Sequence, residues 1–303
     1  MTQPPQLPIA PPVRGPLDVA YLLEASEPRR PVSRVWFFVG GLILVTLFSG
    51  VLTAAAGQAG LLVEVVSAMM VVALMVGLML FTSGVVKRVR AEQQSVESIG
   101  ELVQLRRWSE SAGQLDQILA QPMRTQAARA QALVFLGAVL ARYQRFDDAI
   151  AVYDHLLESR LLDGGSNYGL RLGRAMAMLR QDHLVDADRA ISELRRQTPT
   201  GVESAGLALL ELYRDVKTGH SEEAIQRFGK SLSTMTEQLG HRVSDAWALV
   251  ARAFDLLGRQ DEARQAFQKA TLLSPPVELF RRYPEVQRLE GRYDPTYAPP
   301  EAA

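Results

Sequence analysis

Five small residues recur at nearly constant intervals through the second part of this 303-residue chain. Ser111, Ala149, Ala187, Ala224 and Ala263 are separated by 38, 38, 37 and 39 residues. Apolar residues around them recur every three or four positions, the spacing of one helix face, and no stretch alternates with period two for long. A fixed period of this size is the signature of stacked structural repeats. We therefore expect an all-α chain built largely from repeated helical hairpins.

The clearest single unit covers residues 244–275, where Gly258 separates two helical stretches and Pro275 ends the second. Trp247, Ala251 and Phe254 lie on one face of the first helical stretch. Ala263 and Phe267 lie on one face of the second. This arrangement resembles the tetratricopeptide repeat, whose first helix carries a Trp, a Leu-Gly pair and a Tyr, and whose second carries an Ala and a Phe before a final Pro. Here Val250-Ala251 stands in place of Leu-Gly, and Phe254 in place of Tyr.

The same pattern recurs upstream, with small residues that let helices approach and large residues that fill the spaces between them. This further packing set comprises Gly137, Ala149, Tyr153, Ala187, Ala224 and Phe228. Residues 92–290 are predicted to form a tetratricopeptide-like α-solenoid of about five hairpins, closed by a C-terminal cap in which Leu279 and Phe280 pack inward. The period of the family is about 34 residues. These units therefore carry extra residues, and the fourth hairpin needs about two of them near residues 217–220.

Two long apolar segments precede the repeats. Residues 35–56 carry no charge and residues 61–86 carry only Glu64, and each is long enough to cross the hydrocarbon core of a bilayer. We expect an N-terminal transmembrane helical hairpin with the short loop 57–60. Basic residues flank the hairpin and are absent from its loop, which predicts cytoplasmic N- and C-termini; they are Arg29, Arg30, Arg34, Lys87, Arg88 and Arg90. The resemblance to membrane-anchored bacterial repeat proteins implies an integral protein of the bacterial cytoplasmic membrane.

Both ends of the chain are expected to be disordered tails. Residues 1–34 hold eight of the sixteen prolines and little that would form a core, which predicts a disordered cytoplasmic tail. Within it, residues 18–26 have the composition of one short amphipathic turn, expected to be a transient helix. Residues 291–303 are the second tail.

Four basic residues mark a candidate partner-binding groove. In the family that the repeats resemble, first helices line the concave surface, and Arg142, Arg180, Lys217 and Arg252 lie on those helices. One hypothesis is a basic track that grips an acidic peptide or a C-terminal carboxylate. The alternative is that cations near helix C-termini only complement the helix dipole in water.

Acidic pairs recur at the start of three second helices: Asp147-Asp148, Glu222-Glu223 and Asp261-Glu262. Negative charge stabilises the first turn of a helix, so this recurrence favours helix capping over a metal or acid–base role. The chain has no cysteine, and its four histidines are far apart in sequence. Neither a Gly-rich phosphate loop nor a G-x-S-x-G motif is present. We expect no enzyme activity, no catalytic residue, no cofactor and no metal.

The charge balance argues against nucleic acid as a partner. Residues 91–303 carry 26 of the 33 basic and 29 of the 33 acidic residues, a net charge of −3, whereas nucleic-acid binders usually carry a basic excess. The leading hypothesis is a membrane-anchored adaptor or scaffold that recruits or stabilises protein partners at the cytoplasmic face. An alternative is an accessory subunit of a transporter or membrane enzyme whose transmembrane hairpin is the active part, for which Glu64 is the discriminating residue. A third is a homo-oligomeric scaffold.

Overall fold

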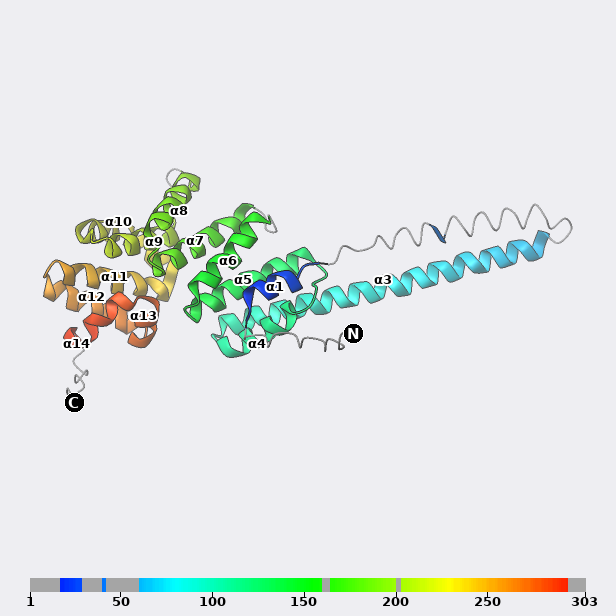
Figure 1. The fold of residues 1–303 in the computed structure, drawn as a ribbon, viewed down its shortest axis with the longest axis horizontal. Coiled ribbons are helices and arrows are strands. Elements are labelled where there is room, and N and C mark those ends of the chain that lie inside the picture. The colour runs from blue at the N-terminus through cyan, green and yellow to red at the C-terminus, as the bar shows by residue number, and fades with distance from the viewer. Residues whose placement is uncertain (1–16, 29–39, 42–59, 160–163, 200–202, 294–303) are drawn as a thin grey trace, which may run out of the picture. The chain divides into compact units, whose positions relative to one another are not determined.

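The computed structural model describes residues 17–28, 40–41, 60–159, 164–199 and 203–293. Every element in these ranges is an α-helix or a short 3-10 helix (Figure 1), in agreement with the all-α class predicted from the sequence. The chain divides into two compact units, residues 1–139 and 140–303, and the boundary falls inside helix α5 (Gln126–Arg142).

The first unit contains a short helix near the N-terminus, α1 (Val19–Ala25), which is packed against the unit. Asp18 caps it by accepting a hydrogen bond from a backbone N–H, and Leu22 is fully buried. The buried guanidinium of Arg129 on α5 donates to the Leu23 carbonyl at 2.8 Å and to the Ser26 hydroxyl at 3.1 Å. These contacts give the short helix a fixed position, which differs from the transient helix expected in a disordered tail.

Helix α3 (Gly60–Gln104) runs without a break through residues 61–86, the predicted second transmembrane helix, and on into the predicted repeat region. Within the part of the chain that the structure describes, no helix has both the length and the apolar character needed to cross a membrane. The predicted transmembrane hairpin is therefore wrong, and so is the integral-membrane localisation inferred from it. The apolar run is only the first part of a longer helix, which continues into charged sequence from Lys87 onward.

Two related predictions lie on residues that the structure does not describe. The predicted first transmembrane helix, residues 35–56, lies outside the described residues apart from Gly40 and Gly41. Glu64 belongs to α3, but its side chain is also outside the described part. The alternative function, an accessory subunit whose active part is the transmembrane hairpin, depended on that hairpin.

The end of α3 packs against α4 (Trp108–Leu119) in the first unit, where Ile99 and Leu115 are buried. Gly100 permits a close approach to α5, because a Cβ atom at this position would lie 2.9 Å from the Phe135 ring. A side chain at Gly100 would therefore force the ring to move.

Five turns of the chain share one backbone geometry. In each, a residue with positive φ follows the first helix of a hairpin: Arg106 (59°), Gln144 (60°), Asp182 (59°), Gly219 (81°) and Gly258 (74°). Their spacing of 38, 38, 37 and 39 residues equals that of the small residues, each of which lies five positions later. The period of the small residues in the sequence therefore corresponds to a repeated turn conformation in the structure.

One type of hydrogen bond also recurs in all five turns. The residue after the positive-φ position donates its backbone N–H to the carbonyl five residues earlier, as in a Schellman cap. The pairs are Arg107–Leu102, Arg145–Leu140, His183–Met178, His220–Asp215 and Arg259–Phe254, with N–O distances of 2.8–2.9 Å. The turn at residues 217–220 matches the others, so it lacks the two extra residues predicted there. Extra length lies in the connections between hairpins and in α10 (Ser221–Leu239), which has 19 residues.

The second unit begins at the end of α5 and contains the later hairpins and a C-terminal stretch of short helices. Its helices are α6 (Phe146–Glu158), α7 (Gly164–Arg180), α8 (Leu184–Gln197), α9 (Ala205–Lys217), α10, η2 (Gly240–Arg242), α11 (Val243–Leu256), α12 (Gln260–Leu273), α13 (Pro276–Arg282), η3 (Pro284–Leu289) and α14 (Glu290–Tyr293).

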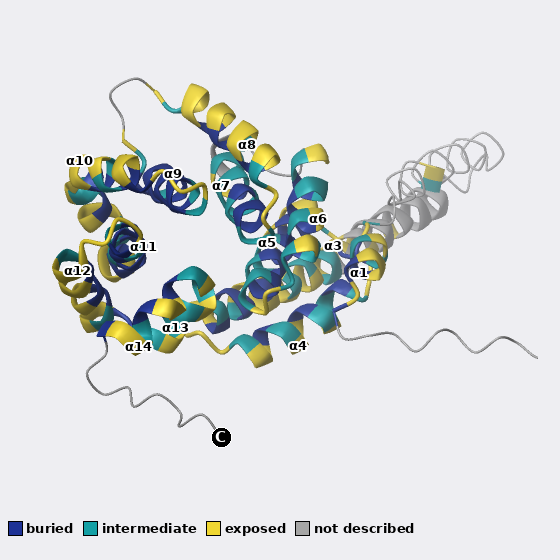
Figure 2. Ribbon diagram, turned by 60° about the vertical axis from the view of Figure 1, so that its left-hand side comes forward, coloured by how far each residue is buried: buried dark blue, intermediate teal, exposed yellow. Residues whose placement is uncertain are grey.

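First helices form the inside of this unit. Helix α9 buries ten of its 13 residues, whereas α8 buries three of its 14, Ala187, Ile191 and Leu194. Figure 2 shows α9 and α11 largely buried and the outer faces of α8, α10 and α12 exposed. The inner helices are covered on several sides, which explains why their apolar residues are not confined to one narrow stripe.

The packing residues predicted from the sequence are mostly inside. The buried members are Gly137, Ala149, Tyr153, Ala187, Ala224, Phe228, Ala251, Ala263 and Phe267. Trp247 and Phe254 are half-buried, and Trp247 makes an edge-to-face contact with Phe228, with ring centroids 4.7 Å apart. Pro275 is exposed and directly precedes α13.

Candidate functional site

Three of the four predicted basic residues end the first helices of successive hairpins. Arg142, Arg180 and Lys217 are the last residues of α5, α7 and α9. Each lies two positions before the positive-φ residue of its turn, so the repeated turn places all three at the same point of the hairpin. The corresponding residue of α11 is Leu256.

Arg142 forms a bidentate ion pair with Glu278 of α13. Its Nη1 lies 2.7 Å from Oε2 of Glu278 and its Nη2 lies 2.8 Å from Oε1, and the Arg142 side chain is 18% exposed. Hydrogen bonding from Arg142 lowers the pKa of Glu278, so the carboxylate is ionised at neutral pH. The planar guanidinium fixes the orientation of this carboxylate as well as its position.

Arg180 lies against two aromatic rings. Its guanidinium carbon is 5.5 Å from the centroid of the Phe146 ring and 5.6 Å from that of the Tyr283 ring. Its Nε is buried and makes no hydrogen bond within the described residues. Burial raises the pKa of Tyr283, so this phenol is neutral. Arg180 therefore holds Tyr283 through the attraction between a cation and an aromatic face.

Lys217 and Tyr213, one turn apart on α9, hold Glu285 of η3 together. Lys217 Nζ lies 3.1 Å from Oε1 of Glu285 and also donates to the Leu179 carbonyl at 2.7 Å. The Tyr213 hydroxyl donates to Oε1 of Glu285 at 3.1 Å. Burial, followed by the charge of Glu285, raises the pKa of Tyr213, so its hydroxyl keeps the proton that it donates. An ammonium and a phenol thus share one carboxylate.

Arg252 does not join the other three basic residues. Its Nη1 lies 2.6 Å from Oδ2 of Asp255 on the same helix, α11. Asp255 in turn accepts hydrogen bonds from Arg292 at 2.8 Å and from the Tyr293 hydroxyl at 3.1 Å, both in α14. Asp245 of α11 likewise pairs with Arg282 at 3.0 Å, so at α11 the residues that reach the C-terminal stretch are acidic. The predicted track of four cations therefore contains three.

Each of the four helices sends at least one of these contacts to residues 276–293, which comprise α13, η3 and α14 and are named here the C-terminal segment. Along this segment, Glu278 contacts α5, Tyr283 contacts α7 and α9, Glu285 contacts α9, and Tyr293 contacts α11. Arg282 and Tyr283 also bind Asp245 of α11, at 3.0 and 3.4 Å, so the segment contacts all four first helices, although not strictly in their chain order.

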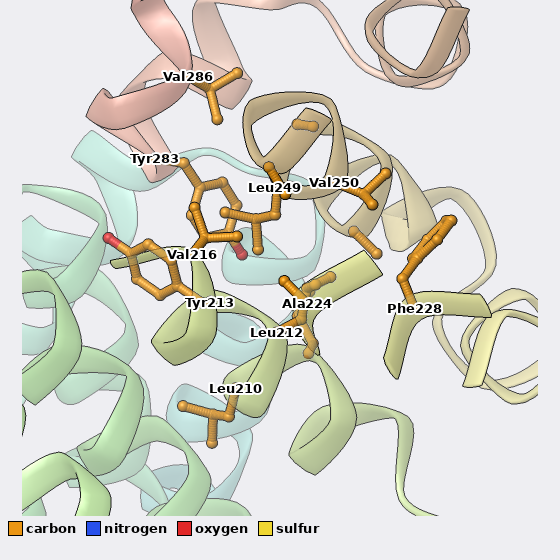
Figure 3. Packing of buried hydrophobic residues seen from close by; sticks show 14 of the residues in the cluster. Leu210, Leu212, Tyr213, Val216, Ala224, Phe228, Leu249, Val250, Tyr283 and Val286 are labelled. Atoms are coloured by element: carbon orange, nitrogen blue, oxygen red, sulfur yellow. The ribbon is translucent and has the colours of Figure 1, made fainter. Parts of the chain in front are cut away.

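The C-terminal segment is also part of the hydrophobic core. Leu279, Tyr283, Val286 and Leu289 are all fully buried. The rings of Tyr283 and Tyr213 meet edge to face with centroids 5.0 Å apart, and Figure 3 shows this pair within the cluster. Burial of four such side chains contributes roughly 1.5–3 kcal/mol each. Apolar burial and ion pairs therefore act together in holding the segment.

The sequence predicted the apolar side of this segment and missed its polar side. Leu279, expected to face inward, is fully buried, and Phe280 stacks on Phe267 with centroids 6.4 Å apart. Glu278, Tyr283 and Glu285 were not singled out. The sequence does contain a pattern that could have predicted these contacts. Two glutamates seven positions apart flank a tyrosine, and three basic residues recur at intervals of 38 and 37 residues at the ends of first helices.

A second charged cluster links α8, α9 and α10. Glu211 and Asp215 of α9 are buried, and Arg227 binds them at 2.6 and 2.9 Å respectively. Glu211 also pairs with Arg195, and Asp215 with Arg214 at 2.7 Å. Each carboxylate is bound by two guanidinium groups, the condition under which buried charges are tolerated. We assign this cluster to the packing of the hairpins.

The acidic pairs lie where helix dipoles favour them. Asp147-Asp148, Glu222-Glu223 and Asp261-Glu262 fall in the first turns of α6, α10 and α12. Two of the pairs also bind the basic residue just before the helix, through Arg145–Asp148 and Arg259–Glu262, both at 2.7 Å. Among the described residues, no group of three or more His, Cys, Asp or Glu side chains is arranged to hold a metal ion.

Comparison of the chain with protein-family models, with curated proteins and with solved structures finds no match. The tetratricopeptide resemblance therefore rests on the sequence pattern alone.

Proposed function

We propose that this chain is a helical-repeat scaffold whose inner face binds a segment of a partner protein. The observation that carries the proposal is the convergence of Arg142, Arg180 and Lys217 on the acidic and aromatic side chains of one segment. The guanidinium of Arg142 and the ammonium of Lys217 bind carboxylates, and Arg180 binds an aromatic ring. Together these three side chains form a surface that recognises carboxylates and aromatic rings.

The chemistry of this surface supports binding rather than catalysis. Its cations are held by ion pairs or by aromatic rings, and its tyrosines keep their protons. The tetratricopeptide resemblance agrees with the proposal, since that family lines its groove with first helices. The membrane tether expected from the sequence is no part of the proposed function.

Affinity capture by the immobilised full chain tests the proposal. The informative variant is Arg180→Gln, which removes the groove cation and keeps most of the side-chain length. The matched control is Arg189→Gln on α8, where the side chain is 70% exposed and pairs with Asp186 at 3.6 Å. Circular dichroism would establish that both variants fold.

We expect wild type and Arg189→Gln to retain the same proteins from a cell extract of the source organism, and Arg180→Gln to lose them. Each retained protein would be identified by mass spectrometry and its binding repeated with purified components. Equal retention by all three chains would show that the inner face is not the binding surface.

A further inference from the structure

We infer that the C-terminal segment, residues 276–293, is a built-in ligand of the inner face, and that the partner presents a segment of the same chemistry and exchanges with it. This inference rests on the proposed function and specifies the partner. It starts from three contacts with this segment, those of Arg142 with Glu278, of Arg180 with Tyr283 and of Lys217 with Glu285.

The bound segment defines what an incoming segment must carry. Two carboxylates stand at positions 278 and 285, with an aromatic ring at 283, to meet the guanidinium, the cation–aromatic site and the Lys217–Tyr213 pair. Aliphatic side chains are needed at positions 279, 286 and 289, because these residues are fully buried. A merely acidic peptide would leave that part of the core uncovered, so charge alone does not define the partner.

The connection to the rest of the chain suits an exchange. Ser274 and Pro275 are both extended and form the short link between α12 and α13. The segment bonds to elements far away in sequence, since Glu278 lies 136 positions from Arg142 and Glu285 lies 72 positions from Tyr213. Rotation at the link would release the segment and leave the hydrogen-bonded hairpin turns intact.

The tether sets the concentration at which exchange occurs. A short link gives an attached segment an effective concentration in the millimolar range. A free peptide that makes the same contacts would therefore half-displace it only at about 1 mM. Loss of a charge-assisted hydrogen bond weakens binding by about tenfold or more. Substitutions that weaken the binding of the attached segment, tested with an unaltered peptide, should therefore lower the peptide concentration needed for half-displacement into a measurable range.

The probe is a fluorescein-labelled synthetic peptide with the sequence of residues 276–293, titrated with the full chain and followed by anisotropy. Compared with wild type, the full chain carrying Glu278→Gln and Glu285→Gln should bind this peptide at a 10- to 100-fold lower concentration. The control peptide carries the same two substitutions and should lose most of that gain. Equal binding of the peptide to the two chains would overturn the inference.

A covalent lock gives a second, independent readout. The chain contains no cysteine, so Gln144→Cys and Arg281→Cys introduce a single reactive pair. These positions are neighbours, because the Gln144 side-chain amide donates to the Arg281 carbonyl at 3.3 Å. In the chain that also carries Glu278→Gln and Glu285→Gln, a short bis-maleimide should link the two cysteines and abolish peptide binding. The same chain left unlinked should bind the peptide as the doubly substituted chain does. Unchanged peptide binding by the linked chain would contradict exchange.

The lock also separates the two proposals. A partner whose capture depends on Arg180 but persists with the linked chain would overturn the built-in ligand and leave the scaffold function standing. A set of captured proteins that ignores Arg180→Gln altogether would overturn the scaffold function itself. Loss of capture by both the Arg180→Gln chain and the linked chain supports both proposals.

Discussion

Single residues set the geometry of each hairpin turn. The five positive-φ positions are occupied by an Arg, a Gln, an Asp and two glycines. In this left-handed region a residue with a side chain is less stable than glycine by roughly 1–2 kcal/mol, and Asp tolerates it better than most. The turns at Gly219 and Gly258 are therefore unstrained, whereas Arg106 and Gln144 are held in place by the surrounding packing.

Gly258→Ala and Gly229→Ala should have opposite effects on stability. Gly258 has a φ of 74°, so a methyl group there should lower the free energy of unfolding by about 1 kcal/mol. Gly229 lies inside α10 with open space around its Cα, so the same change should raise it by up to about 1 kcal/mol. Urea denaturation would measure both, and a stabilised Gly258→Ala chain would contradict the assigned turn.

Glu278 should make stability depend on pH. Hydrogen bonding from Arg142 lowers its pKa, so its contribution is fully present above the ordinary glutamate pKa of about 4.3 and is lost as pH falls through the lowered value. Glu278→Gln should therefore cost about 1–2 kcal/mol at pH 7 and progressively less as the pH falls through the lowered pKa of Glu278. Urea denaturation at pH 7 and across the acid range would test this, and a pH-independent difference would exclude the ion pair as its source.

At the scale of elements, the sequence predicted what local pattern determines. The small residues from Ser111 to Ala263 mark the start of each second helix, and these positions are buried in α4, α6, α8, α10 and α12. Two features escaped prediction for physical reasons. Helix α3 continues past its apolar part because nothing after Val86 breaks a helix, and hydropathy alone does not show this. The partners of Glu278 and Glu285 are distant in sequence, and periodicity carries no information about such pairs.

Enlarging a repeat-defining small residue should disrupt its hairpin. Ala263 of α12 is fully buried, so Ala263→Leu should overpack the contact with α11 and lower the free energy of unfolding by roughly 1–3 kcal/mol. Leu272→Ala on the same helix is the control, because Leu272 is 84% exposed and its loss should cost less than about 0.5 kcal/mol. An Ala263→Leu chain as stable as wild type would show that this position is not at a close helix contact.

At the scale of the whole folded second unit, the C-terminal segment joins elements that a simple repeat array would leave independent. In such an array each repeat contacts only its neighbours, and stability is a sum of local contributions. Here Glu278 reaches α5 and Tyr293 reaches α11, so one segment ties the first helix of the unit to a late one. We therefore expect this unit to unfold in one cooperative transition.

Leu289→Ala should loosen that coupling. Leu289 is fully buried, so the change should lower stability by about 2–5 kcal/mol. In a chain whose Trp36 and Trp108 are replaced by Phe, it should separate the unfolding followed by Trp247 fluorescence from that followed by circular dichroism. Gln287→Ala, at an exposed position of the same 3-10 helix, should leave the two transitions coincident. Coincident transitions in both variants would mean that the segment does not couple the hairpins.

The position of the C-terminal segment in the chain also affects how the protein is made. Arg142 leaves the ribosome 136 residues before its partner Glu278. At about 5–20 residues per second, that separation corresponds to roughly 7–27 seconds of synthesis. During this interval the remaining hairpins are made one after another, and the apolar and basic inner face that they add stays uncovered until the segment follows. A nascent chain therefore exposes a surface that the finished protein conceals, and a partner or chaperone that binds during translation meets it without competition.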